Sequence, residues 1–315
     1  MVKYIIKRIL YLLPVLAVVA VVDFVIIHLT PGDPASVILG ADATDVDLAK
    51  LREQLGLNLP IYIQFGRWLW GVVHGNLGWS LFMDMPVSTA IWQHLWPTVS
   101  LTFLAETIAI LVALPLGVMA AANRGTWLDQ SFMTLALLGI SIPSFWIGLN
   151  FIMLFAVQLN WLPAAGYQPL ANGLINHLKY LIMPAISLGI MQGALIARMT
   201  RSSLLEVLNE NYIRTAEAKG LKRWVIIFKH ALRNAFIPIL TVIGLTFAVL
   251  IGGAVVTETV FNIPGIGKLI VTSVLRRDYA VIQGAILMTA TSYVLINLVI
   301  DLMYALIDPR VRLSK

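Results

Sequence analysis

Three carboxylates stand inside apolar stretches of the sequence: Asp23, Glu106 and Asp301. An ionised side chain is costly in lipid, so such residues usually face a polar interior or a water-filled cavity. There they can relay protons or contact a polar solute, or they can simply accept hydrogen bonds from neighbouring helices. The amides of Asn150 and Gln192 could act in the same two ways. Asp23, Glu106, Asn150 and Gln192 are therefore the candidate pathway-lining residues, with a purely structural role as the alternative.

Two other patterns suggest chemistry that the sequence does not support. "PGIGK" at 264–268 hints at a phosphate loop, but such a loop needs Gly-x-x-x-x-Gly-Lys-Ser/Thr, and Leu269 follows the lysine. Proline and glycine favour turns, so we expect a turn at Pro264, Gly265 and Gly267. His28 and His74 could contact a metal, although histidines are ordinary at a membrane boundary. The sequence predicts no catalytic, cofactor or metal site, and no cysteine is present for disulfides or thiolate ligands.

The charged stretch "NYIRTAEAKGLKRWVIIFKHALRNA" at 211–235 interrupts an otherwise apolar chain. Residues 211–219 are good helix formers, and Gly220 suits the position after a helix where φ turns positive. A second helix is expected from about Lys222 to Arg233. At 100° per residue one sector of it is basic and the opposite side is apolar, with only Ile226 breaking the pattern. The basic sector contains Lys222, Arg223, Lys229, His230 and Arg233, and the apolar side contains Trp224, Val225, Ile227, Phe228, Ala231 and Leu232.

Three structures could explain this stretch. A membrane-surface helix would be held by its apolar face and by anionic lipid. A small separate domain is excluded, because about 40 residues cannot bury a sufficient core. A docking element would present two short helices to another protein and pass rigid-body motion into the adjoining spans. The pattern favours the docking element.

The elements around these residues form an integral membrane protein. Only 12% of the 315 residues are charged and the mean hydropathy is +0.86, which excludes an ordinary soluble protein. The sequence predicts an all-α fold with six transmembrane helices. The first is expected at Ile9–Leu29 within the N-terminal segment 1–29, which we read as a retained span rather than a cleaved signal peptide. The other five are expected at about 97–121, 131–157, 181–197, 236–260 and 281–307.

The distribution of basic residues predicts the orientation. With the N-terminus inside, the inner side receives fifteen Lys and Arg residues and the outer side seven, so both termini should be cytoplasmic. The loop 198–235 and the tail 308–315 are then cytoplasmic, and segment 30–96 is extracytoplasmic. This segment should contain a short helix that begins at Thr44 with an Asp47 capping box and ends at Gly56. The tryptophan-rich piece after Pro60 should lie along the outer membrane surface.

Several motifs together carry a family resemblance. "YIRTAEAKGL" followed by "HALRNAFIP" resembles the cytoplasmic loop of the permease subunits of bacterial ABC importers, in particular the dipeptide, oligopeptide and nickel branch. That loop has a Glu-Ala-Ala segment with a glycine four residues after the second alanine, and Ala216 and Gly220 occupy these two positions. Arg214 and Thr215 stand where Glu and Ala would be, so the role of that glutamate is not carried over. "TPGDP" at 30–34, "TETVFNIPGIGKL" at 257–269, "RRDYAVIQG" at 276–284 and "DPRVR" at 308–312 agree with the same branch.

The resemblance implies a type I ABC importer permease fold, with 97–307 as the permease core, in the bacterial inner membrane. It further implies a non-catalytic subunit that forms half of a pathway for di- or oligopeptides or glutathione. The partners would be a sister permease, two ATP-binding subunits that hold the ATP and an extracytoplasmic binding protein, with no nucleic acid and no cofactor of its own. Nickel or metal-chelate import by the same architecture is an alternative; an ion-coupled secondary carrier and a non-transporting scaffold are alternatives of other classes. The residues expected to couple to an ATPase are Tyr212, Arg214, Ala216, Gly220 and Arg233.

Overall fold

The computed structural model describes residues 2–29, 34–39, 44–54, 56–80 and 82–307. Within them the fold is helical, apart from one two-stranded antiparallel ribbon that pairs Trp79 with Pro86 and Ser80 with Met85. The α-helices are α1 Val2–Leu29, α2 Pro34–Leu39, α3 Asp45–Gln54, α4 Ile61–Val73, α5 Val87–Ala122, α6 Trp127–Ser141, α7 Ser144–Phe151, α8 Leu174–Leu208, α9 Asn211–Ala218, α10 Arg223–Val225, α11 Leu232–Gly253, α12 Val255–Val260, α13 Ile266–Arg276 and α14 Tyr279–Ile307. The strands are β1 Trp79–Ser80 and β2 Met85–Pro86, π-helical segments cover Ile152–Gln158 and Ile226–Ala231, and a 3₁₀ turn covers Leu170–Asn172.

Five of the described helical segments are long and apolar enough to cross a membrane, and a bent pair makes a possible sixth. The five segments are Arg8–Ile26, Val87–Ala122, Leu174–Leu208, Arg223–Gly252 and Tyr279–Tyr304. This confirms the predicted all-α membrane fold. The segment expected at 236–260 differs in detail, because α11 ends at Gly253 and α12 is a separate short helix.

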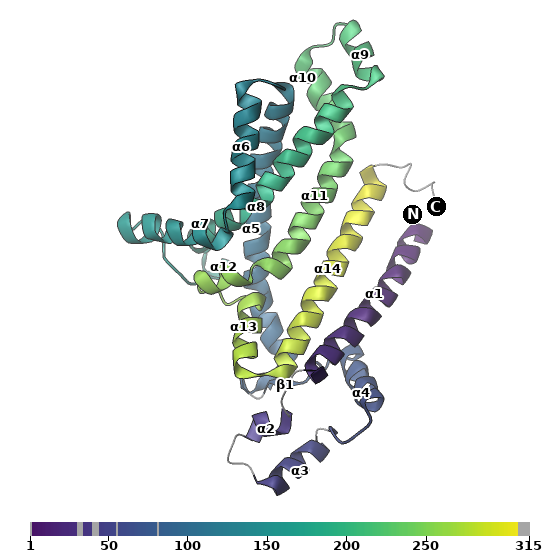
Figure 1. Cartoon of the computed structure of the whole chain (residues 1–315), viewed down its shortest axis with the longest axis vertical. Helices are drawn as coiled ribbons and strands as arrows, with labels where there is room; N and C mark the ends of the chain where they lie inside the picture. The colour runs from purple at the N-terminus through teal and green to yellow at the C-terminus, as the bar shows by residue number, and fades with distance from the viewer. Residues whose placement is uncertain (1, 30–33, 40–43, 55, 81, 308–315) are drawn as a thin grey trace. The chain divides into compact units, whose positions relative to one another are not determined.

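The span expected at 131–157 is not one straight helix. It consists of α6 and of α7 with its π-helical continuation, and the two parts are bent by 94° (Figure 1). Ile142 and Pro143 between them are extended. Proline has no N–H to continue the helix, and it disfavours the helical conformation of the residue before it. Four other prolines of the apolar stretches stay within helices: Pro14, Pro115, Pro184 and Pro238.

The chain divides into two compact units. The first, called the core unit here, comprises 97–264 and the described residues from 295 onward; the second, called the N-terminal unit, comprises 2–96 and 265–294. In the core unit α8 packs against α6, α7 and α11. Buried residues of α5, α8 and α11 and of the turn after α12, including Leu101, Leu181, Leu250 and Phe261, form a shared hydrophobic cluster.

Small residues bring α5 and α8 close together within the core unit. A Cβ on Gly189 would lie 2.9 Å from the Ala105 carbonyl oxygen, and one on Gly117 would lie 2.6 Å from the Ala197 carbonyl oxygen. The residues that make this approach recur every fourth position on both helices, which is the small-xxx-small pattern of membrane helix pairs. They are Ala105, Ala109, Ala113 and Gly117 on α5, and Gly189, Gly193 and Ala197 on α8.

The N-terminal unit contains a helix that Thr44 caps at its predicted start. The Thr44 hydroxyl accepts a hydrogen bond from the Asp47 N–H at 3.2 Å and donates one to the Asp47 carboxylate at 2.6 Å, at the start of α3. Gly56 follows that helix with φ +68°, as expected for a residue that ends it. Later in the unit, the Ser80 hydroxyl donates to the Asp278 carboxylate at 2.5 Å, which joins the β-ribbon to the start of α14.

Candidate functional site

The predicted charged loop is a compact helical turn at one end of the core unit (Figure 1). α8 extends to Leu208, α9 follows directly, and α10 begins after a short turn. The turn is centred on Gly220, whose φ is +74°. The Gly220 N–H bonds to the Glu217 carbonyl at 2.9 Å and the Leu221 N–H to the Ala216 carbonyl at 3.3 Å. These two bonds make a Schellman motif, so the predicted glycine turn is confirmed in its conformation.

The helix α9 has one face inside the protein and one face outside. Ile213 and Ala216 are buried in a hydrophobic cluster that also contains Val118 of α5 and Leu204 of α8. Arg214 and Glu217 are exposed, and Glu217 lines a pocket together with the cluster residues Ile226 and Ile227. Ala216, one of the predicted coupling residues, therefore anchors α9 to its own chain, while the polar face remains free.

Tyr212 and Arg233 occupy different environments. The Tyr212 hydroxyl accepts a hydrogen bond of 2.8 Å from the Asn234 amide, and the same amide donates to the His230 carbonyl. This contact joins the start of α9 to the start of α11. Arg233 is exposed on α11.

The prediction of a second helix at about Lys222–Arg233 is wrong about which of its side chains are buried. Its first turn, α10, passes into the π-helical segment Ile226–Ala231 and then continues as α11, so it is the beginning of a span rather than a separate helix. A π-helix bonds i to i+5 and turns fewer degrees per residue, so a wheel drawn at 100° misplaces its side chains. Ile226, which broke the apolar pattern, is buried, whereas Trp224 and Phe228 are 63% and 57% exposed.

Two contacts that the sequence did not reveal hold this loop against the neighbouring helices. The Arg223 guanidinium donates a hydrogen bond to the carbonyl of Ala122, the last residue of α5, where a basic side chain satisfies a free helix-end carbonyl. The Arg201 guanidinium forms a two-pronged ion pair with Asp129, at 2.5 and 2.7 Å, between α8 and α6. Asp129 also accepts the Gly125 N–H at 3.0 Å, which fixes the turn between α5 and α6.

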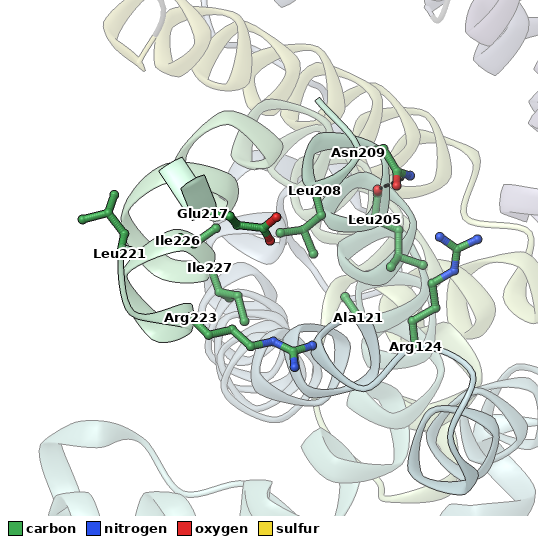
Figure 2. Close-up of a pocket in the computed structure, with 10 residues that line it drawn as sticks. All are labelled: Ala121, Arg124, Leu205, Leu208, Asn209, Glu217, Leu221, Arg223, Ile226 and Ile227. Atoms are coloured by element: carbon green, nitrogen blue, oxygen red, sulfur yellow. Dashed lines mark hydrogen bonds between the residues drawn. The ribbon is translucent and has the colours of Figure 1, made fainter. Parts of the chain in front are cut away.

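A pocket of about 430 Å³ opens beside α9, between the ends of α5 and α8 and the start of α10 (Figure 2). Its polar lining groups are the side chains of Arg124, Asn209, Glu217 and Arg223 (Figure 2). The apolar lining residues are Ala121, Leu205, Leu208, Leu221, Ile226 and Ile227. The lining therefore mixes charged and apolar side chains, and no group of His, Asp and Glu among the described residues could hold a metal ion.

Three of the predicted pathway residues, Glu106, Asn150 and Gln192, belong to the core unit. Glu106 is buried on α5 and accepts a 2.8 Å hydrogen bond from the Thr246 hydroxyl of α11, with its second oxygen unpaired. Gln192 is buried on α8, and the exposed Asn150 donates to the Trp146 carbonyl of its own helix. Asp23, buried on α1, belongs to the N-terminal unit. Among the described side chains of Glu106, Asn150 and Gln192 no mutual hydrogen bond is formed, and for Glu106 the contact with Thr246 fits the structural alternative.

The other residues singled out for chemistry have local roles. His74 is exposed, bonds to the Trp70 carbonyl at 2.8 Å and stacks on the Trp70 ring. The His28 side chain is outside the described residues. Pro264 and Gly265 precede α13 as predicted, but Gly267 lies in its first turn rather than in a loop.

Two further motifs of the resemblance are packing motifs in this structure. In "TETVFNIPGIGKL" the buried Glu258 accepts a 2.6 Å hydrogen bond from Thr98 of α5. Phe261 of the same motif packs so closely on Gly148 of α7 that a Cβ there would lie 2.7 Å from its ring. In "RRDYAVIQG", Arg277 adopts a left-handed conformation and the Asp278 carbonyl accepts the Ile282 N–H at the start of α14. "TPGDP" and "DPRVR" lie almost wholly outside the described residues.

Comparison with known proteins decides the family. Residues 113–313 match the binding-protein-dependent transport system inner membrane component, and residues 1–102 match the N-terminal part of such components. The chain belongs to this family of permeases. It is thus a non-catalytic inner-membrane subunit of a binding-protein-dependent transport system.

The permease has curated relatives that align over nearly the whole length of both chains. It is 46% identical to a probable peptide ABC transporter permease protein of Sinorhizobium fredii, over 98% of this chain and 99% of that one. It is 44% identical to the dipeptide transport system permease protein DppB of Alkalihalophilus pseudofirmus, over 99% and 100%. It is 43% identical to the glutathione transport system permease protein GsiC of Salmonella paratyphi A, over 99% of each chain.

A solved structure shares the fold of the permease. A chain of the inward-facing MetNI methionine ABC transporter superposes with a TM-score of 0.59 at 19% identity, covering 69% of this chain and 96% of that one. At this identity the likeness shows the fold alone, and it supports the predicted permease architecture.

Proposed function

We propose that this permease forms half of the pathway of an ATP-driven importer of peptides, with di- and oligopeptides or glutathione as the substrate class. Relatives at 43–46% identity over almost the entire chain carry peptide, dipeptide and glutathione transport in their names. A sister permease supplies the other half of the pathway, and a binding protein delivers the substrate from outside the cytoplasm. Two ATPase subunits bind the ATP, so this chain needs no cofactor.

The coupling mechanism is inferred from α9, which has both buried apolar residues and exposed charged residues. Ile213 and Ala216 are buried against α5 and α8, whereas the charged side chains of Arg214 and Glu217 on the same helix are exposed. A short helix that is held firmly on one face and free on the other can dock in a groove of an ATPase and move with it. The Tyr212 contact with Asn234 and the direct continuation into α8 pass such a movement into two spans.

The docking role is tested by changing the free face without disturbing the buried one. In the assembled complex, Arg214→Glu with Glu217→Arg should release the ATPase subunits or abolish the ATPase stimulation by loaded binding protein. The matched control exchanges Lys219 for Glu, which alters charge at the edge of the same helix. If the doubly exchanged chain purifies with its ATPase and transports at the normal rate, α9 is not the docking surface.

The substrate class needs a separate measurement. The complex purified with its binding protein should release peptides that mass spectrometry identifies. Recovery of a nickel ion or a metal chelate in their place would favour the metal-import alternative, and transport without any ATPase subunit would favour an ion-coupled carrier.

A further inference from the structure

The helix α4 of the N-terminal unit shows apolar surface on two sides. Phe65 packs edge to face on Phe24 of α1 and Trp68 packs on it at a tilt, with ring centroids 5.2 and 5.6 Å from the Phe24 ring. On another side Tyr62, Trp70 and Val73 are 72%, 69% and 72% exposed. No residue of α4 is fully buried.

The exposed apolar side of α4 is one continuous stripe. At 100° per residue, Tyr62, Gly66, Val73 and Trp70 fall within about 80° of one another. The residues that contact α1 lie next to this stripe, so the apolar arc covers more than half of the helix. Gln64 and Arg67 form the remaining narrow polar edge, and the Gln64 amide bonds to the carbonyls of Leu57 and Leu59 in the preceding loop.

The packing on Phe24 fixes the depth of α4 relative to the span α1. Phe24 lies five residues before Leu29, the last residue of α1, which corresponds to about 7 Å along the helix. The 28 residues of α1 span about 42 Å, close to the full thickness of a membrane with its headgroups. A helix that contacts α1 about 7 Å from its end is therefore level with the boundary between headgroups and hydrocarbon.

We propose that α4 lies in the plane of the membrane and inserts the stripe Tyr62, Gly66, Trp70 and Val73 into the lipid leaflet in which α1 ends. Tryptophan and tyrosine concentrate at this depth, where the ring is in an apolar environment and the polar atom reaches water. Arg67 on the polar edge is positioned to contact lipid phosphates. The side chains of Val21, Val22 and Ile26, exposed on α1 at the same level, belong to a candidate span, so lipid already surrounds the neighbouring surface. This inference does not depend on the proposed transport function.

The absence of cysteine from the sequence allows a direct test. Single cysteines are introduced as Tyr62→Cys and Val73→Cys on the stripe, as Arg67→Cys on the polar edge, and as Val46→Cys on α3 as an exposed control. Each full-length chain is labelled with a nitroxide and reconstituted in phosphatidylcholine–phosphatidylglycerol vesicles. Electron paramagnetic resonance then measures the collision rates of the label with oxygen, which enriches in lipid, and with a water-soluble nickel chelate.

The expected result is a shift of the oxygen-to-nickel collision ratio toward oxygen at positions 62 and 73, relative to positions 67 and 46. All four native side chains are exposed, so the labels should not disturb folding, and a monodisperse elution profile checks this. Equal ratios at 62, 73 and 46 would show that the stripe faces water and would overturn the proposal. Labels at 62 and 73 shielded from both probes would show that protein covers the stripe, which would overturn it too.

Discussion

The turn at Gly220 allows the coupling mechanism to be tested through the backbone alone. Gly220 has φ +74°, and a Cβ built there would meet no heavy atom within 4 Å. A substitution at this position therefore introduces no steric clash with other residues, and its effect comes only from the conformational preference of the new residue. Alanine in the left-handed region costs about 1 kcal/mol, and a β-branched valine costs about 2 kcal/mol. Asparagine tolerates this region and should cost least.

These free energies predict a graded loss of coupling. A cost of about 1 kcal/mol lowers the population of the intact turn relative to its alternatives about fivefold, and about 2 kcal/mol lowers it about thirtyfold. With the turn broken, α9 no longer holds its angle to α10, so the exposed face of α9 cannot be presented correctly. Stimulation of ATP hydrolysis by substrate-loaded binding protein should then fall in the order Gly, Asn, Ala, Val, and peptide uptake into vesicles should fall with it.

A second glycine provides the matched control. Gly75 has φ +78° and also has no heavy atom within 4 Å of a built Cβ, but it lies in the N-terminal unit. Gly75→Ala introduces the same backbone strain without touching the charged loop, and should leave stimulation unchanged. Full coupling in Gly220→Val, or an equal loss in Gly75→Ala, would refute the reasoning.

Three further outcomes follow from contacts in the structure. Asp129→Asn leaves the Arg201 guanidinium without its carboxylate, so the complex should lose about 1–3 kcal/mol of stability, measured as a lower Tm in detergent. The charge-exchanged pair Asp129→Arg with Arg201→Asp should recover part of this stability. Tyr212→Phe removes only the hydrogen bond with Asn234, so ATPase stimulation should weaken by a factor corresponding to about 1 kcal/mol while Tm stays unchanged; a variant indistinguishable from wild type would show that this bond transmits nothing. Arg277→Gly relieves a left-handed non-glycine residue with φ +57°, so Tm should rise by the equivalent of about 1 kcal/mol, and a fall would show that the Arg277 side chain makes a contact worth more than the strain.

Features that depend on neighbours along the chain were predictable from sequence. The apolar spans, the helix cap at Thr44 and the positive φ of Gly220 each follow from a few adjacent residues. The bend at Pro143 was not separable from the other prolines, because Pro115 and Pro184 remain inside continuous helices. Whether a proline ends a helix depends on what neighbouring helices offer to the freed carbonyls, and this is tertiary information.

The candidate site was predictable in its location but not in its internal contacts. The π-helical segment Ile226–Ala231 rotates the side chains away from a 100° wheel, and no local signal announces it. Arg201 and Asp129 are 72 positions apart, so their ion pair depends on how α6 and α8 are placed. The small residues at every fourth position of α5 and α8 were a readable signal of close helix packing that periodicity of hydrophobic residues alone does not detect.

The contact between α5 and α8 also divides α8 into two segments whose lengths can be compared. It runs along α8 from Gly189 to Ala197 and is centred on Gly193, which leaves about 22 Å of helix toward Leu208 and about 28 Å toward Leu174. A rigid rod that rocks about a fulcrum at Gly193 has two arms of similar length. Any sideways displacement applied where α8 joins α9 would reappear at the opposite end with the reverse sign and slightly greater amplitude.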